Sequence, residues 1–153
     1  MGATTLESVN LPLCSSVGYM AFTQCFNIST VNLPSCTYIG NRAFSSCTNL
    51  NSISIPLCTT IDSYAFYHTN LINFDAPNLV ELMGSRHFYG CSLLNTVNLP
   101  ECLSIPNYCF YGCSSLTTIS ASKCQTLDEA CFCTAGLVSA AFPACIDCGS
   151  EKF

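Results

Sequence analysis

Cysteine recurs every eleven residues along this chain, and that spacing restricts the fold more than any other feature of the sequence. Cysteines stand at positions 14, 25, 36, 47 and 58, and the spacing resumes at 91, 102, 113 and 124. Other residues repeat only at every second step, as in VNLPLC at 9–14, VNLPSC at 31–36, ISIPLC at 53–58 and VNLPEC at 97–102. The unit is therefore about 22 residues long, a period typical of solenoids, in which each unit packs on its neighbours.

The units follow the pattern L-x-x-[VI]-x-[LI]-P-x-C-x-x-[VI]-G-x-x-A-F-x-x-C-x-x. They begin near residues 6, 28, 50, 71, 94 and 116, and a partial unit begins near residue 137. The third unit is one residue short and the fourth is one residue long. We therefore expect one repeat domain over residues 6–148, followed by a C-terminal tail over residues 149–153.

Each unit divides into a strand and an irregular half. Its segment x-x-[VI]-x-[LI] alternates polar and apolar residues, which predicts a half-buried strand, and the proline that follows ends the strand. One such strand per unit gives a parallel stack. The second half is too short for a full helix, so we expect a short helical or 3₁₀ turn there, or a second brief strand. The phenylalanines that recur once per unit should form an internal aromatic spine: Phe22, Phe44, Phe66, Phe88, Phe110 and Phe132.

The two cysteine columns are interpreted as small buried side chains of the core. Where a column lacks cysteine it holds Leu79, Thr69 or Ala135, and none of these is a usual metal ligand. Disulfides between stacked units and zinc binding are the less favoured alternatives. Cys109 and Cys131 should also be buried, and Cys133 exposed. The column cysteines predicted to lie in the core are Cys14, Cys25, Cys36, Cys47, Cys58, Cys91, Cys102, Cys113 and Cys124.

A pair of cysteines near the C-terminus, Cys145-x-x-Cys148, departs from the columns. A single C-x-x-C is weak evidence for redox or metal chemistry. A local disulfide or a frayed end is favoured over catalysis.

The motif LPxCxxIGxxAFxxCxxL, repeated in one register over about residues 6–148, resembles the BspA-type leucine-rich repeat of bacterial and protozoan surface proteins. The resemblance implies a leucine-rich repeat solenoid, curved and right-handed, with a parallel sheet on its concave face. It also implies a binding or adhesion protein of the cell surface or a secreted protein. The chain begins without a recognisable signal peptide, so a cytoplasmic location stays open.

Two surfaces are candidates for ligand binding. One is the outward face of the strands, a polar platform whose alternative role is simply to solvate the sheet: Ser8, Thr30, Ser52, Asn73, Thr96, Thr118 and Ser139 in one column, and Asn10, Asn32, Ser54, Asp75, Asn98, Ser120 and Ala141 in the next. The other is an edge rich in tyrosine, a residue enriched in interface hot spots. Its candidates are Tyr64, Tyr67, Tyr89, Tyr108 and Tyr111, with Arg86 and His87 projected beside Tyr89 by a bulge in the long fourth unit.

Composition and motifs exclude several functions. Only 4 of the residues are Lys or Arg and the net charge is −5, which disfavours nucleic-acid binding. No run of eighteen apolar residues is available for membrane insertion. No phosphate-binding loop or nucleophile motif occurs, so we expect no enzyme activity, no cofactor and no metal. The expected function is recognition of a protein or glycan; the alternative is head-to-tail self-association through the solenoid ends.

Overall fold

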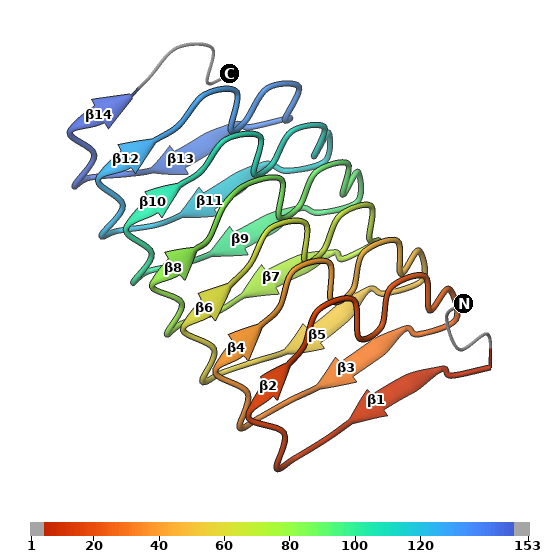
Figure 1. The fold of residues 1–153 in the computed structure, drawn as a ribbon. Coiled ribbons are helices and arrows are strands. Elements are labelled where there is room, and N and C mark those ends of the chain that lie inside the picture. The colour runs from red at the N-terminus through yellow and green to blue at the C-terminus, as the bar shows by residue number, and fades with distance from the viewer. Residues whose placement is uncertain (1–4, 149–153) are drawn as a thin grey trace.

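The computed structural model describes residues 5–148, which form a parallel β-solenoid with its termini at opposite ends (Figure 1). Each turn carries one three-residue strand and one two-residue strand. The three-residue strands are β1 (Ser8–Asn10), β3 (Thr30–Asn32), β5 (Ser52–Ser54), β7 (Asn73–Asp75), β9 (Thr96–Asn98), β11 (Thr118–Ser120) and β13 (Ser139–Ala141). The two-residue strands are β2 (Ser16–Val17), β4 (Tyr38–Ile39), β6 (Thr60–Ile61), β8 (Glu81–Leu82), β10 (Ser104–Ile105), β12 (Thr126–Leu127) and β14 (Asp147–Cys148).

Strands of successive turns pair in parallel, so equivalent residues of the repeat face each other. In the first row β1, β3 and β5 form one sheet and β7, β9, β11 and β13 another; in the second row the sheets are β2, β4, β6, β8 and β10, β12, β14. The second row is interrupted where the sequence removes a donor. The residue after β6, Asp62, donates its N–H to Ile39, but the residue after β10 is Pro106, which has no N–H for the carbonyl of Leu82.

The third side of each turn is a chain of tight turns that also bonds to the next unit. In the second unit the N–H groups of residues 42, 44 and 46 donate to carbonyls of the following unit, and those of residues 43, 45 and 47 donate three residues back. Arg42 and Ser46 have positive φ, as do the equivalent residues of other units. The brief second strand that the sequence allowed is present at β2 and its counterparts. No helix occurs in residues 5–148, and alternate N–H groups of this side bond to the following unit instead of within the turn.

The six recurring phenylalanines form the predicted spine. Their ring centroids are 5.1–5.6 Å apart from one unit to the next, with planes within 13° of parallel. Phe74 of β7 adds a seventh ring that packs on Phe66 and Phe88, with centroids 5.4 and 4.6 Å away. Phe22 and Cys14 are only half-buried, unlike the core positions predicted for them, because the first described unit has a stacked neighbour on one side alone.

The cysteine columns act as buried hydrogen-bond donors as well as packing groups. In the first column each thiol donates to the carbonyl two residues on, as Cys36 does to Tyr38 at 3.2 Å. In the second column Cys47, Cys91 and Cys113 each donate to a phenylalanine carbonyl of the preceding unit, as Cys47 does to Phe22 at 2.9 Å and Cys113 to Phe88 at 3.1 Å. All fourteen cysteines are free thiols in this structure, including those of the stacked columns. Cysteine thus combines the size of a small hydrophobe with a weak S–H donor.

Burial suppresses the acidity of these thiols. It raises the pKa of Cys47, Cys58 and Cys102 to about 12, and the pKa of Cys91 to about 11. The thiolate is the reactive form of cysteine, so these side chains should be chemically inert in the folded protein.

We predict that iodoacetamide at pH 8 leaves Cys47, Cys58 and Cys102 unmodified under conditions that alkylate the exposed Cys148. The physical reason is their combined burial and raised pKa. Peptide mass spectrometry after brief labelling measures the modification of each cysteine, and labelling in urea is the control, in which every cysteine should react. Alkylation of native Cys102 as fast as that of Cys148 would contradict the buried cysteine columns.

Candidate binding surfaces

Two columns of large side chains flank the buried Ala-Phe pair on the turn side of the solenoid. In each unit one residue immediately precedes this pair and another immediately follows it. We call the resulting surface the tyrosine–arginine face. Its first column is Arg42, Tyr64, Arg86 and Tyr108, and its second is Tyr67, Tyr89 and Tyr111.

The second column is a continuous stack of phenol rings. The centroids of Tyr67 and Tyr89 are 5.4 Å apart with an angle of 20° between the planes, and those of Tyr89 and Tyr111 are 4.8 Å apart at 9°. All three side chains are partly exposed. The repeat therefore places three tyrosines predicted from sequence side by side, each presenting part of its ring to solvent.

The first column alternates cations and aromatic rings. The guanidinium carbon of Arg42 lies 4.9 Å from the ring centroid of Tyr64, and that of Arg86 lies 4.6 Å from that of Tyr108. Arg86 also lies 5.9 Å from the centroid of Tyr64 and donates to its hydroxyl at 3.3 Å. Cation–π contacts of this kind orient both partners.

Two members of this surface were missed by the sequence reasoning. Arg42 stands 22 residues before Tyr64, so the repeat period itself was the signal that would have placed it in the column. The ring of His68 meets Tyr67 edge-on with centroids 4.3 Å apart, and no sequence signal indicated this contact. The two columns also contact each other, since the centroids of Tyr64 and Tyr67 are 5.6 Å apart.

His87 is not part of this surface, and its prediction as a ligand-binding residue is wrong. Its side chain is fully buried at the position that holds Ala43 and Ala65 in earlier units. The extra residue of the fourth unit falls between Leu82 and Arg86, and the Met83 carbonyl in this bulge accepts a hydrogen bond from His87 Nε2 at 3.0 Å. The bulge thus satisfies a histidine in the core, while Arg86 alone projects outward.

Burial lowers the pKa of His87 to about 4, since the charged ring would lose its hydration. Hydrogen bonding to Met83 and the nearby Asp62 oppose this effect. Nδ1 faces the thiol of Cys109 at 3.8 Å, a weak partner. The imidazole is therefore neutral at pH 7 in the folded protein.

The outward face of the strands is exposed, and several of its polar side chains bond to one another. Asn32 donates to the side chain of Asn10 at 2.9 Å, and Asn98 donates to Asp75 at 2.8 Å. Thr96 donates to Asn73 at 2.7 Å in the neighbouring column. These bonds between stacked units favour the structural interpretation of the sheet face, because they use donors and acceptors that a ligand would need.

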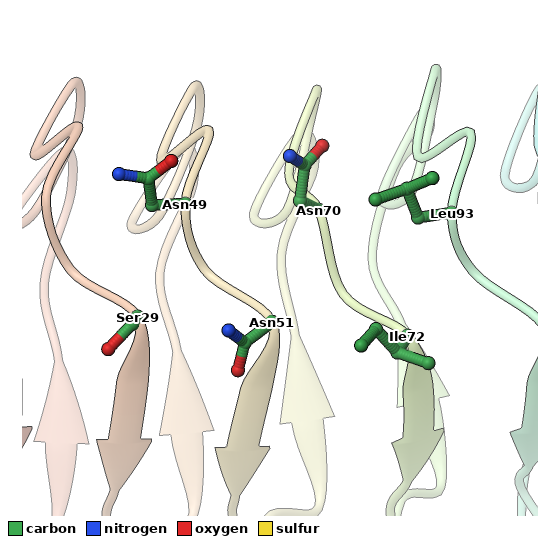
Figure 2. A pocket seen from close by; sticks show the side chains of 6 residues that line it. All are labelled: Ser29, Asn49, Asn51, Asn70, Ile72 and Leu93. Atoms are coloured by element: carbon green, nitrogen blue, oxygen red, sulfur yellow. The ribbon is translucent and has the colours of Figure 1, made fainter.

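A shallow hollow of about 390 Å³ lies where the first row of strands is interrupted, between β5 and β7 (Figure 2). Asn51 and Ile72 immediately precede these two strands, and Asn70 lies in the link that is one residue short. The lining carries no charge: Ser29, Asn49, Asn51, Asn70, Ile72 and Leu93. The hollow offers amide donors and acceptors beside two aliphatic side chains, and none of these residues was singled out from the sequence.

Residues 5–148 contain no group of three or more His, Cys, Asp or Glu side chains that is arranged to hold a metal ion. Within the same range there is no helix long and apolar enough to cross a membrane. The described surfaces offer aromatic packing, cation–π interaction and hydrogen bonding.

Comparison with known proteins places this geometry in context. A family model described as a BspA type leucine rich repeat region matches residues 1–91 and 57–153. A leucine-rich repeat protein from T. pallidum superposes with a TM-score of 0.62 at 24% identity, covering 85% of this chain and 77% of that one. A leucine-rich cell surface protein from Faecalibacterium prausnitzii gives a TM-score of 0.54 at 18% identity, covering 95% and 55%. No curated protein matches this chain.

The buried imidazole predicts a pH-dependent stability. The folded pKa of about 4 lies below the unfolded value of about 6.5, so the unfolded chain binds the extra proton between them. Above pH 6.5 His87 is neutral in both states and does not lower the free energy of unfolding. As the pH falls towards 4, protonation of His87 in the unfolded chain lowers the free energy of unfolding by up to about 3 kcal/mol.

His87→Ala restores the residue common in this column. It should make the free energy of unfolding less dependent on pH between pH 7 and 4. Urea denaturation across this range measures it. His68→Ala is the matched control, because the His68 side chain is exposed and should leave the wild-type profile intact. An unchanged pH profile in His87→Ala would contradict the assignment.

Proposed function

Because the chain belongs to the BspA-type leucine-rich repeat family, we propose that it is a non-enzymatic binding module that recognises a protein partner through the tyrosine–arginine face. The observation that carries the proposal is the continuous array of partly exposed, mutually stacked Tyr and Arg side chains. The family is often associated with cell surfaces and adhesion, and a solved relative is described as a leucine-rich cell surface protein. We accordingly propose a role at the cell surface or in secreted form.

The energetics support this face over the sheet face. Tyrosine and arginine are enriched in interface hot spots because they bury a large area and keep polar tips. Here stacking and cation–π contacts already restrict the side chains, so binding loses less conformational entropy. On the sheet face, by contrast, three pairs of polar side chains are engaged with their stacked neighbours.

Charge favours a protein partner with acidic or carbonyl-rich groups. Of the three Lys and Arg residues in the described part of the chain, Arg42 and Arg86 lie on this face, whereas Lys123 pairs with Glu101 elsewhere. The whole chain carries −5, so the face is a local concentration of donors on an otherwise acidic molecule. Such a site attracts carboxylates through charge-assisted hydrogen bonds.

We expect Tyr89→Ala to weaken binding to a protein hit by at least about tenfold, the effect typical of a hot-spot residue. Arrays of purified extracellular proteins and of glycans supply the candidate ligands, and surface plasmon resonance measures each affinity. Thr118→Ala on the sheet face is the control variant, which should bind like the wild type. A ligand that Thr118→Ala fails to bind but Tyr89→Ala still binds would contradict the proposal. Binding to glycans alone would also contradict it.

A second candidate function is self-association through the ends of the solenoid. Large apolar side chains are highly exposed in the first and last described units: Leu13 is 90% exposed, Val138 85% and Ile146 83%. Stacking of one end on another copy would cover them.

Under the binding proposal we expect the purified protein to keep a monomeric mass over a wide concentration range. Light scattering with and without reductant measures this mass. A mass that rises with concentration and ignores reductant would instead identify the solenoid ends as an interface. A rise in mass that reductant abolishes would point to intermolecular disulfides. It would contradict the expected monomer under oxidising conditions.

A further inference from the structure

The geometry points to a dithiol modification site at Cys145 and Cys148, which reacts with low-molecular-weight disulfides and closes to an intramolecular disulfide. The two Sγ atoms already lie 3.3 Å apart. A disulfide bond is about 2.05 Å long, so closure requires an approach of just over 1 Å within a single turn. The site is separate from the tyrosine–arginine face and does not depend on the proposed function.

Accessibility distinguishes this pair from the buried cysteines of the columns. Cys148 is exposed and Cys145 is partly exposed, so a small disulfide can reach them. Cys124, which precedes Cys145 in the same column, is buried, and its pKa is raised to about 11. Cys124 therefore competes poorly with Cys145 and Cys148 in thiol–disulfide exchange, because the attacking species is the thiolate.

The local hydrogen bonds hold the pair in position. Cys145 Sγ lies 3.3 Å from the Asp147 carbonyl, a contact that repeats the pattern of its column. Cys148 ends β14, whose partner strand is β12, and it stands opposite Leu127 in that pairing. Both sulfur atoms are thus placed by backbone contacts that recur in other turns of the solenoid.

The reaction proceeds by two thiol–disulfide exchanges. The Cys148 thiolate attacks one sulfur of the small disulfide, whose sulfur–sulfur bond breaks to release one small thiol after protonation. The Cys145 thiolate then attacks the Cys148 sulfur of the mixed disulfide, forming the Cys145–Cys148 bond and releasing the second small thiol. The two cysteines lose two electrons and two protons, and the small disulfide gains them.

Closure links Cys145, two residues before β14 begins, covalently to Cys148, the last residue of β14. Residues 145–148 become a closed loop, which restricts the conformations open to this segment. The dithiol is consequently a redox-controlled clamp on residues 145–148, at the end of the cysteine column that contains the buried Cys124.

The test treats the full-length native protein with excess oxidised glutathione and follows it by intact mass and peptide mapping. Wild type should lose about 2 Da through one Cys145–Cys148 disulfide. Cys145→Ser should instead retain a glutathione adduct at Cys148, because the resolving thiol is absent. Cys133→Ser, which changes another partly exposed thiol, should behave like wild type. Circular dichroism of each variant verifies that the solenoid is folded.

Three outcomes overturn the inference: wild type that stays unreacted, wild type that accumulates a stable glutathione adduct, or a disulfide that joins Cys124 to either residue. Hydrogen exchange provides a second measurement. Amides of 145–148 should exchange more slowly in the oxidised than in the reduced protein, and equal rates would contradict the clamp. Ligand binding by Tyr89→Ala is independent of both measurements, so failure here and failure of the proposed function are distinguishable.

Discussion

The division of backbone hydrogen bonds between each turn and its neighbour is the constraint on which the rest of this structure depends. On the irregular side, alternate N–H groups bond within the turn and to the following unit, which positive φ at residues such as Arg42 and Ser46 makes possible. Units are thereby fixed at one spacing, and every column of side chains must tolerate a copy of itself about 5 Å away. Phenylalanine meets this condition by parallel stacking, and cysteine by its small size and its S–H donor.

Departures from the repeat show how the same constraint creates local features. The bulge after Leu82 supplies a carbonyl for His87, so an insertion and a polar core residue compensate each other. The short link at Asn70 coincides with the interruption between β5 and β7 and with the amide-lined hollow. Pro106 interrupts the second row by removing one donor. Each irregularity changes hydrogen bonding or shape nearby while the phenylalanine spine continues through it.

The proposed binding surface follows from the repeat rather than from a specialised loop. Because equivalent positions stack, a preference for Tyr or Arg at two positions in consecutive units builds an ordered array several units long. Its side chains contact each other before any partner arrives, which reduces the entropy cost of binding. The same principle applied to the sheet face gives the opposite result, since short amides and hydroxyls that stack satisfy one another.

The sequence by itself determined the solenoid and the phenylalanine spine, because a strict period forces equivalent residues into columns whatever the details of the backbone. It also placed the tyrosines together, and the same period would have added Arg42. Only the tertiary structure decided where the irregular residues point. His87 turned inward because a carbonyl in the bulge accepts its hydrogen bond, and Cys145 and Cys148 came within 3.3 Å because the last turn folds as the others do. Such outcomes depend on partners supplied by neighbouring turns, which the local sequence does not specify.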